Sequence, residues 1–339
     1  MPGGPEPFSY LSDPAFHLFD IDADARQLIF LQTTEQTLRQ SAFLDGRTAI
    51  SVDGRLHRVP LRKALNQTAD INLDPHPRFL LHTSFCGSTL LANAIQAASN
   101  VLVLREPNIL VQLSNLKAAQ HKLYLDKAIW PALIQLTLNQ LGKTWSPGAV
   151  LVKPSNWANT LLSDVKATDG PLSAMYMTMS EDAYLLANLR GGKERLAYSL
   201  QLMNHLLNSG LMDRSAVLEV ERGQHSPIGR LLRLLSLTHG AQQHILSDQL
   251  PDAVALTLPD LQNDLRGNLL IAGDALGLTI NPVWADRKLG DVSTQHAKNG
   301  SEVFSTDVEA AENRRLRNTF AADFDDLANW RDTPARDTA

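Results

Sequence analysis

The 339-residue sequence contains a single cysteine, Cys86, and so cannot form a disulfide within the chain. One cysteine in a chain of this length is typical of a reducing compartment, and we expect a cytoplasmic protein. The first residues lack the basic segment and the apolar segment of a secretory signal peptide. The longest weakly polar stretch, residues 269–280, is interrupted by Asp274 and is too short to cross a bilayer.

The sequence also has no excess of positive charge. Its formal net charge is −5 at neutral pH, and its basic residues form no long run. Nucleic acid is therefore not expected as a partner, because phosphate backbones bind clustered Lys and Arg. The ten histidines are scattered; His239 and His244 are five residues apart, which does not place them on one face of a helix. We predict no metal site.

The patterning divides the chain into two unequal parts. Residues 1–77 are predicted to be an accessory N-terminal region, in which short alternating runs and a turn at Asp53-Gly54 indicate a hairpin with short helices. These runs cover residues 27–31, 49–52 and 56–59. Pro75 and Pro77 mark the expected boundary, because prolines end regular structure and favour extended linkers.

Residues 78–330 are predicted to form the main domain, followed by a charged tail at 331–339. In the main domain, short apolar runs alternate with longer stretches of helical periodicity. The apolar runs cover residues 79–81, 101–104, 149–152, 174–179 and 253–258. This alternation predicts an α/β fold with a mostly parallel sheet and helices on both faces.

The segment 78–98 carries the most specific signal. Its apolar run predicts a buried strand, a turn of small residues follows, and apolar residues then recur at helical spacing from a start near Ser88. A turn between a strand and a helix N-terminus exposes unpaired N–H groups to an anion. Gly87 allows a ligand to approach the backbone closely, and Ser88 and Thr89 add hydroxyl groups. We predict a phosphate site here.

The loop is not a Walker A motif, because it lacks the first glycine and the lysine before Ser88. It resembles instead the 5'-phosphosulfate loop of sulfotransferases, which follows a PxSGTT-like pattern at the end of the first strand. Gly87, Ser88 and Thr89 match the core of that pattern. The sequence departs from the family at Phe85, where a Lys or Arg is usual, and at Cys86, where a Ser is usual.

The resemblance implies a P-loop-like three-layer α/β fold for residues 78–330. It also implies 3'-phosphoadenylyl sulfate (PAPS) as co-substrate, transfer of a sulfuryl group to a hydroxyl or amine acceptor, and no metal. On this basis the nucleotide is expected to contact the residues of the loop, which are Ser84, Phe85, Cys86, Gly87, Ser88 and Thr89.

Catalytic residues are expected at the carboxyl ends of the parallel strands, where open α/β sheets bind ligands. Lys153 follows the third apolar run at the position of the lysine in the KTH-like motif of the cytosolic sulfotransferases, and Ser155 occupies the place of its histidine. We predict Glu106 as the general base and Lys153 as the group that stabilises the leaving oxygen. The alternative is that Arg105 or Lys153 forms an ion pair with Glu106 that only orders the loop.

The residues expected to bind the 3'-phosphate depart most from the family. Ser180 is predicted to be the N-cap of a helix, and Asn188 lies eight residues later; we assign both to the nucleotide site. Arg190, Lys193 and Arg195 either replace a missing arginine or form an exposed helix end. A late basic loop, in which Lys298 follows Arg287, Lys288 and His296, is expected to close over the phosphate.

Two other functions remain open, and so does the role of Cys86. One is an atypical P-loop kinase, for which Asp182 is the nearest candidate ligand of magnesium. Another is a catalytically degenerate nucleotide-binding protein, which Phe85 favours because it replaces the loop cation. Cys86, at a helix N-terminus, is either a thiolate nucleophile or a packing residue, and the local sequence favours packing.

Overall fold

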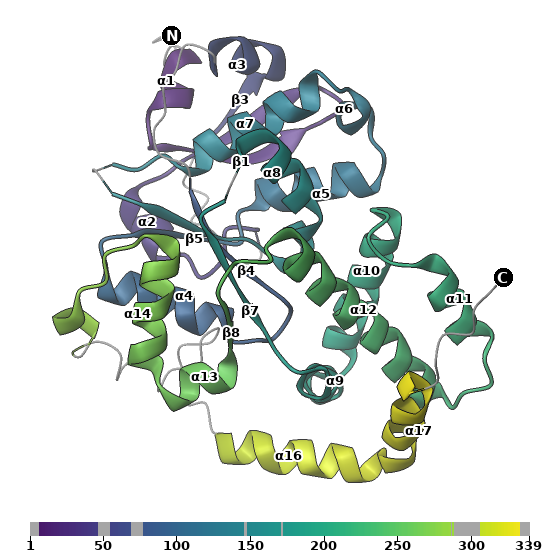
Figure 1. The fold of residues 1–339 in the computed structure, drawn as a ribbon. Helices are drawn as coiled ribbons and strands as arrows, with labels where there is room; N and C mark the ends of the chain where they lie inside the picture. Colours follow the sequence, from purple (N-terminus) through teal and green to yellow (C-terminus); the bar gives the residue numbers. More distant parts are fainter. Residues whose placement is uncertain are drawn as a thin grey trace.

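The computed structural model describes residues 7–46, 55–68, 77–145, 148–170, 172–285, 287 and 306–332. At its centre is a five-stranded sheet of order β5-β6-β4-β7-β8, in which every neighbouring pair is parallel (Figure 1). Its strands are β4 (Arg78–His82), β5 (Leu102–Arg105), β6 (Val150–Lys153), β7 (Ala174–Thr178) and β8 (Ala255–Thr257). Each predicted run overlaps one of these strands, so the predicted parallel sheet is confirmed.

The sheet is covered on both faces, as its almost unbroken apolar strands require. In β4, Phe79 and Leu81 pack into one core cluster while Leu80 packs into another, because successive side chains of a strand point to opposite faces. The first cluster includes side chains of α5 (Asn108–Ala118), α7 (Ile129–Leu141) and α8 (Leu162–Asp169). The second includes side chains of α4 (Ser88–Ala98), α9 (Glu181–Arg190) and α14 (Leu265–Leu276).

The remaining helices of this part surround the carboxyl ends of the strands or connect the larger helices. They are α6 (Lys122–Leu125), the 3-10 helix η1 (Asn156–Leu161), α10 (Gly192–Asn208), α11 (Arg214–Arg222), α12 (Pro227–Gln249) and α13 (Leu258–Asn263). Gly277 caps α14 in the left-handed region, with φ +59°. In the described ranges, no helix is long and apolar enough to cross a membrane.

The N-terminal region forms a small antiparallel sheet of order β1-β2-β3. Its elements are α1 (Pro7–Ser12), β1 (Phe16–Asp22), β2 (Gln27–Gln32), α2 (Glu35–Gln40), β3 (Leu56–Pro60) and α3 (Leu61–Thr68). Two of the predicted runs correspond to β2 and β3, which pair with each other; the predicted run 49–52 and the turn at Asp53-Gly54 lie outside the described residues. Leu18 and Phe30 belong to the same core cluster as Phe79 and Leu102, so the small sheet packs directly on the main domain.

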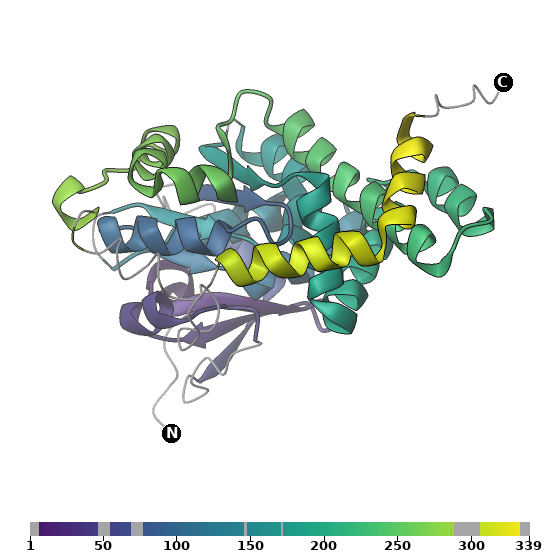
Figure 2. The same ribbon diagram turned by 90° about the horizontal axis from the view of Figure 1, so that it is seen from below.

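The last two helices, α16 (Thr306–Thr319) and α17 (Ala321–Asp332), run along the outside of the main domain (Figure 2). Ion pairs join both helices to α9: Glu309 and Arg317 of α16 pair with Arg190 and Asp182, and Arg331 of α17 pairs with Glu181. Phe324 and Leu327 of α17 are buried in the second core cluster. The chain therefore continues as packed helix to the end of the described residues.

The N-terminal region is also attached through one buried ammonium group. Lys143, which follows α7, donates hydrogen bonds to the carbonyl oxygens of Tyr10 (3.0 Å), Asp13 (3.0 Å) and Phe16 (2.6 Å). Removal from water disfavours the charged form, so burial lowers the pKa of Lys143 from 10.5 to about 7. Through these three hydrogen bonds the end of α7 is joined to α1 and to the start of β1.

We expect Lys143→Met to lower the free energy of unfolding by about 1–3 kcal/mol, because it removes three hydrogen bonds to main-chain carbonyls. Between the folded pKa of about 7 and the unfolded value of 10.5, the unfolded chain binds more protons, so the lysine's contribution to stability rises with pH. Urea unfolding of parent and variant should therefore differ more at about pH 9 than at about pH 7. Lys63→Met, on an exposed position of α3, is the control; a difference that shrinks as pH rises contradicts the argument.

Candidate functional site

The loop between β4 and α4 has the strand–turn–helix geometry that the sequence predicts. Gly87 is the N-cap residue of α4 and lies in the left-handed region, with φ +83°. A Cβ at this position would lie 2.7 Å from Leu258 Cδ1, so a side chain would strain both the backbone and its neighbour. Phe85 is also left-handed, with φ +61°, an uncommon conformation for an aromatic residue. Ser88 and Thr89 form the first turn of α4, and both are buried.

Cys86 faces the core. Its thiol is fully buried and lies within hydrogen-bond distance of the carbonyl oxygens of Thr83 (3.2 Å) and Met177 (3.4 Å). Burial raises the pKa of this thiol, which keeps it protonated at neutral pH. The contacts support the packing role and argue against a thiolate nucleophile. The main chain of Cys86 remains part of the loop.

The two predicted catalytic residues meet at the ends of neighbouring strands. Lys153 closes β6, is 1 % exposed, and donates a hydrogen bond of 2.8 Å to Glu106 Oε1 just beyond β5. The Glu106 main-chain N–H donates in turn to the Lys153 carbonyl oxygen at 2.6 Å. Glu106 is left-handed, with φ +55°, which turns its side chain out of the regular strand path. Arg105 is not part of this pair; its Nε donates to Asn93 Oδ1 at 3.0 Å.

His82, the last residue of β4, completes this cluster. Its Nε2 lies 3.2 Å from Lys153 Nζ and 2.9 Å from the Pro154 carbonyl oxygen, and its Nδ1 lies 2.6 Å from the Thr83 carbonyl oxygen. Burial, and then the charge of Lys153, lower the pKa of His82 to about 3, so the ring is neutral at neutral pH. The short contact at Nδ1 favours the tautomer that donates to Thr83 and accepts from Lys153. Sequence reasoning did not assign this role to His82.

Ser84 is fixed from the far side of the loop. Asn156, the first residue of η1, donates to Ser84 Oγ at 2.8 Å and to Gln242 Oε1 at 2.7 Å. The Tyr198 hydroxyl donates to Asn156 Oδ1 at 2.6 Å. One buried amide thereby joins the loop to α10 and α12.

The residues predicted for the 3'-phosphate lie on α9 behind this loop. Ser180 is the N-cap of α9, as predicted, and accepts a hydrogen bond from Ala183 N at 3.3 Å. Asn188 is completely buried; it donates to the Tyr184 carbonyl oxygen at 2.9 Å and accepts from Ser199 Oγ at 2.6 Å. Lys298, and with it Lys288 and His296, lies outside the described residues.

Of the cations Arg190, Lys193 and Arg195, which lie around the end of α9, Arg195 reaches the loop. The Arg195 guanidinium lies over the Phe85 ring, 4.8 Å from its centroid. Phe85 stacks at 6.2 Å on Tyr184, which stacks at 4.6 Å on His239. Arg190 pairs with Glu309 instead, so the cation beside Phe85 comes from α10.

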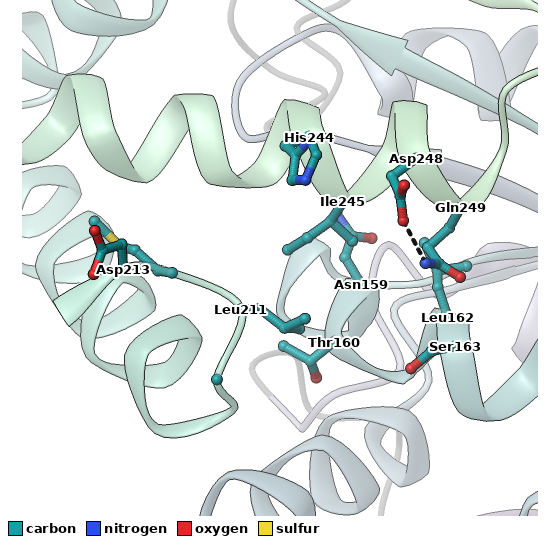
Figure 3. Close-up of a pocket in the computed structure, with 12 residues that line it drawn as sticks. Asn159, Thr160, Leu162, Ser163, Leu211, Asp213, His244, Ile245, Asp248 and Gln249 are labelled. Carbon is teal, nitrogen blue, oxygen red and sulfur yellow. Dashed lines mark hydrogen bonds between the residues drawn. The ribbon is translucent and has the colours of Figure 1, made fainter. Parts of the chain in front are cut away.

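A cavity of 330 Å³ lies between η1 and α12 (Figure 3). It is lined by residues of η1 and α8, of the α10–α11 loop and of α12, among them Asn159, Thr160, Asp213, His244 and Asp248. Asn159 also donates a hydrogen bond of 3.0 Å to the His82 carbonyl oxygen, although His82, Lys153 and Glu106 are not among the residues that line this cavity. In the part of the chain that the structure describes, no three His, Cys, Asp or Glu side chains are placed to hold a metal ion.

We predict that Lys153 and Glu106 are strongly coupled in their contributions to the free energy of unfolding. We expect Lys153→Met to lower the free energy of unfolding by about 3–5 kcal/mol, because it leaves a buried carboxylate without its counter-ion. The double variant Lys153→Met/Glu106→Gln should regain part of this loss in urea unfolding. Lys193→Met, at an exposed position of α10, is the control and should change stability by less than about 0.5 kcal/mol. A double variant less stable than Lys153→Met alone contradicts the coupling.

No protein-family model matches this chain, and no curated protein matches its sequence. Among solved structures, it is similar to a sulfotransferase domain from the curacin biosynthetic pathway, with 13% identity, coverage of 73% of this chain and 98% of that chain, and a TM-score of 0.38. It is also similar to retinol dehydratase in complex with retinol and PAP, with 11% identity, coverage of 79% and 88%, and a TM-score of 0.29. Similarities this distant leave the function to be argued from the residues themselves.

Proposed function

We propose that this protein is a PAPS-dependent sulfotransferase that transfers a sulfuryl group to a hydroxyl or amine acceptor. One observation carries the proposal. A buried cluster of a cation, a carboxylate and an imidazole, Lys153, Glu106 and His82, lies at the strand ends beside a strained loop that opens a helix. Backbone strain that surrounding contacts hold in place is concentrated at functional sites.

The loop fits the 5' end of such a nucleotide. In this proposal the main chain of residues 84–89 and the hydroxyl groups of Ser84, Ser88 and Thr89 surround the phosphate and the sulfuryl group. The helix dipole of α4 adds favourable potential at the same point. Gly87 is needed there because its backbone conformation and Leu258 leave no room for a side chain.

The missing loop cation has a substitute in this proposal. Phe85 carries no charge, but it holds the Arg195 guanidinium against its ring face, 4.8 Å from the centroid. Arg195 is only half-buried, so an anion can reach it. We also assign Ser180 and Asn188 to the nucleotide site. The late basic segment with Lys298 is proposed to close over the 3'-phosphate.

The transfer itself is an in-line displacement at sulfur. The acceptor oxygen forms the new O–S bond as the bond from sulfur to the bridging phosphate oxygen breaks, and adenosine 3',5'-bisphosphate (PAP) leaves with the electron pair. Glu106 takes the proton that the acceptor hydroxyl loses. Lys153 stabilises the negative charge that grows on the bridging oxygen. His82, neutral and bonded to Lys153, keeps that ammonium at the strand ends.

The nucleotide choice is tested by thermal shift. We expect PAP to raise the melting temperature in the absence of magnesium, because the loop has no Walker lysine and Asp182 is paired with Arg317. At 100 times its Kd, PAP should add about 2.7 kcal/mol to the free energy of unfolding. ATP with magnesium is the comparison; a shift with ATP and magnesium but none with PAP favours a kinase and overturns the proposal.

Catalysis is tested by Glu106→Gln. The amide keeps the shape of the side chain and an acceptor for Lys153 but cannot take the acceptor's proton. We expect turnover to fall by about 10²–10⁴-fold while the affinity for PAP stays near that of the parent. Glu219→Gln, at an exposed position of α11, is the control. Tight binding of PAP without any turnover in the parent identifies instead a degenerate nucleotide-binding protein.

A further inference from the structure

The N-terminal region contacts the main domain along the strand that leads to Glu106. β5 is an edge strand of the five-stranded sheet, and α2 lies beside it (Figure 1). An edge strand leaves main-chain N–H and C=O groups without a neighbouring strand, and such groups need other partners when they are buried. Residues 35–46, which comprise α2 and the chain after it, supply these partners at both ends of β5. We call residues 35–46 the edge segment.

Arg39 attaches the edge segment to the chain just before β5. Its guanidinium donates hydrogen bonds to the carbonyl oxygens of Val101 at 2.9 Å and of Asn100 at 3.0 Å. Glu35, one turn earlier in α2, pairs with the same guanidinium at 2.8 Å. The Arg39 carbonyl oxygen in turn accepts a hydrogen bond of 3.0 Å from Gln96 of α4. The first half of the edge segment is therefore fixed at the start of β5.

Leu44 attaches the edge segment to the other end of β5, on both sides of Glu106. Its N–H donates to the Arg105 carbonyl oxygen at 2.8 Å, and its carbonyl oxygen accepts from the Asn108 N–H at 3.1 Å. Glu106 and Pro107 lie between these two bonds. Proline has no N–H, so the next main-chain donor after Glu106 is that of Asn108. Leu44 is fully buried, and its two hydrogen bonds bracket Glu106 from the N-terminal region.

Glu106 depends on such anchors because its backbone conformation is strained. A residue other than glycine at φ +55° persists only where the surrounding structure determines that conformation. The Glu106 N–H donates to the Lys153 carbonyl oxygen at 2.6 Å, which is an anchor from β6. The two bonds of Leu44 are the anchors from the N-terminal region. Together they set the direction in which the Glu106 carboxylate leaves the chain and meets Lys153 Nζ at 2.8 Å.

We propose that the N-terminal region is a working part of the site and that Leu44 is a positioning residue for Glu106. The two main-chain bonds of Leu44 hold the left-handed turn that directs the Glu106 carboxylate to Lys153. The inference rests on the proposed function for the role of Glu106 as general base. The positioning itself does not depend on the reaction, so it can be measured without an acceptor.

Asn108→Pro removes one of the two bonds with little other change. Asn108 is the first residue of α5, a position that favours proline because its N–H has no partner within the helix. Pro107 already has the extended backbone that a residue before proline adopts, with φ −57° and ψ 127°. Asn108→Ala is the matched control, since it keeps the N–H and loses only the side chain, which accepts a hydrogen bond of 3.4 Å from Gln112.

The measurement is the coupling between Lys153 and Glu106 in urea unfolding. It is obtained from Lys153→Met, Glu106→Gln and the double variant, each made in the Asn108→Pro and in the Asn108→Ala background. We expect the coupling with Asn108→Pro to be half or less of that with Asn108→Ala, because the carboxylate is no longer held at the ammonium. A bond with a purely structural role would lower the stability of every protein of the cycle alike. Equal coupling in the two backgrounds therefore overturns the inference.

A second pair of variants gives the same comparison if Asn108→Pro does not fold. Leu44→Ala and Leu38→Ala each shorten a buried leucine of the edge segment in the same core cluster. Both should lower the stability, but only Leu44→Ala should lower the coupling between Lys153 and Glu106. An equal loss of coupling in both assigns the effect to general loosening of the segment and overturns the role of Leu44.

The thermal shift with PAP separates this inference from the proposed function. Asn108→Pro leaves the loop 84–89 unchanged, so we expect it to keep the shift that PAP causes in the parent. A parent that shows no shift with PAP overturns the proposed function, whereas a loss of coupling in Asn108→Pro still supports the positioning of Glu106 by Leu44. A parent that shifts with PAP and a coupling that Asn108→Pro leaves unchanged overturn the inference alone.

Discussion

The buried ion pair between Lys153 and Glu106 is the interaction on which the site depends. Two charges removed from water are tolerated only when each has a close partner and further hydrogen bonds. Here Lys153 Nζ donates to Glu106 Oε1 at 2.8 Å, and the Glu106 N–H donates to the Lys153 carbonyl oxygen at 2.6 Å, which joins the ends of β5 and β6. His82 adds the end of β4 at 3.2 Å from the same ammonium. Three adjacent strands are thus held in register at the edge where ligands bind in open α/β sheets.

Much of the main domain could be predicted because its signals are local. An almost continuous apolar run identifies a strand buried on both faces, and each of the five runs overlaps a strand. The start of α4 at Ser88 and the end of α14 at Gly277 follow from residue type, since small residues at a turn and a left-handed glycine leave few alternatives. The meeting of Glu106 and Lys153 also followed, because residues at the carboxyl ends of adjacent parallel strands share one edge.

What could not be predicted depends on contacts between distant segments. His82 ends its strand like any other strand residue, and its role appears only when β6 brings Lys153 beside it. The stacking of Arg195 on Phe85 depends on how α10 turns back after α9, which residue patterns near Gly191 do not specify. The sequence also could not predict that the N-terminal sheet shares a core with the main domain, because apolar periodicity identifies a buried face but not the element that packs on it.

The short helix η1 connects the two halves of the proposed site. In a 3-10 helix, residues three apart lie above one another on the same side. Asn156 and Asn159 have this spacing, and both amides point at the β4 end: Asn156 holds Ser84 Oγ at 2.8 Å, and Asn159 holds the His82 carbonyl oxygen at 3.0 Å. One short helix therefore fixes both Ser84, in the loop, and the main chain of His82, whose ring lies 3.2 Å from Lys153 Nζ.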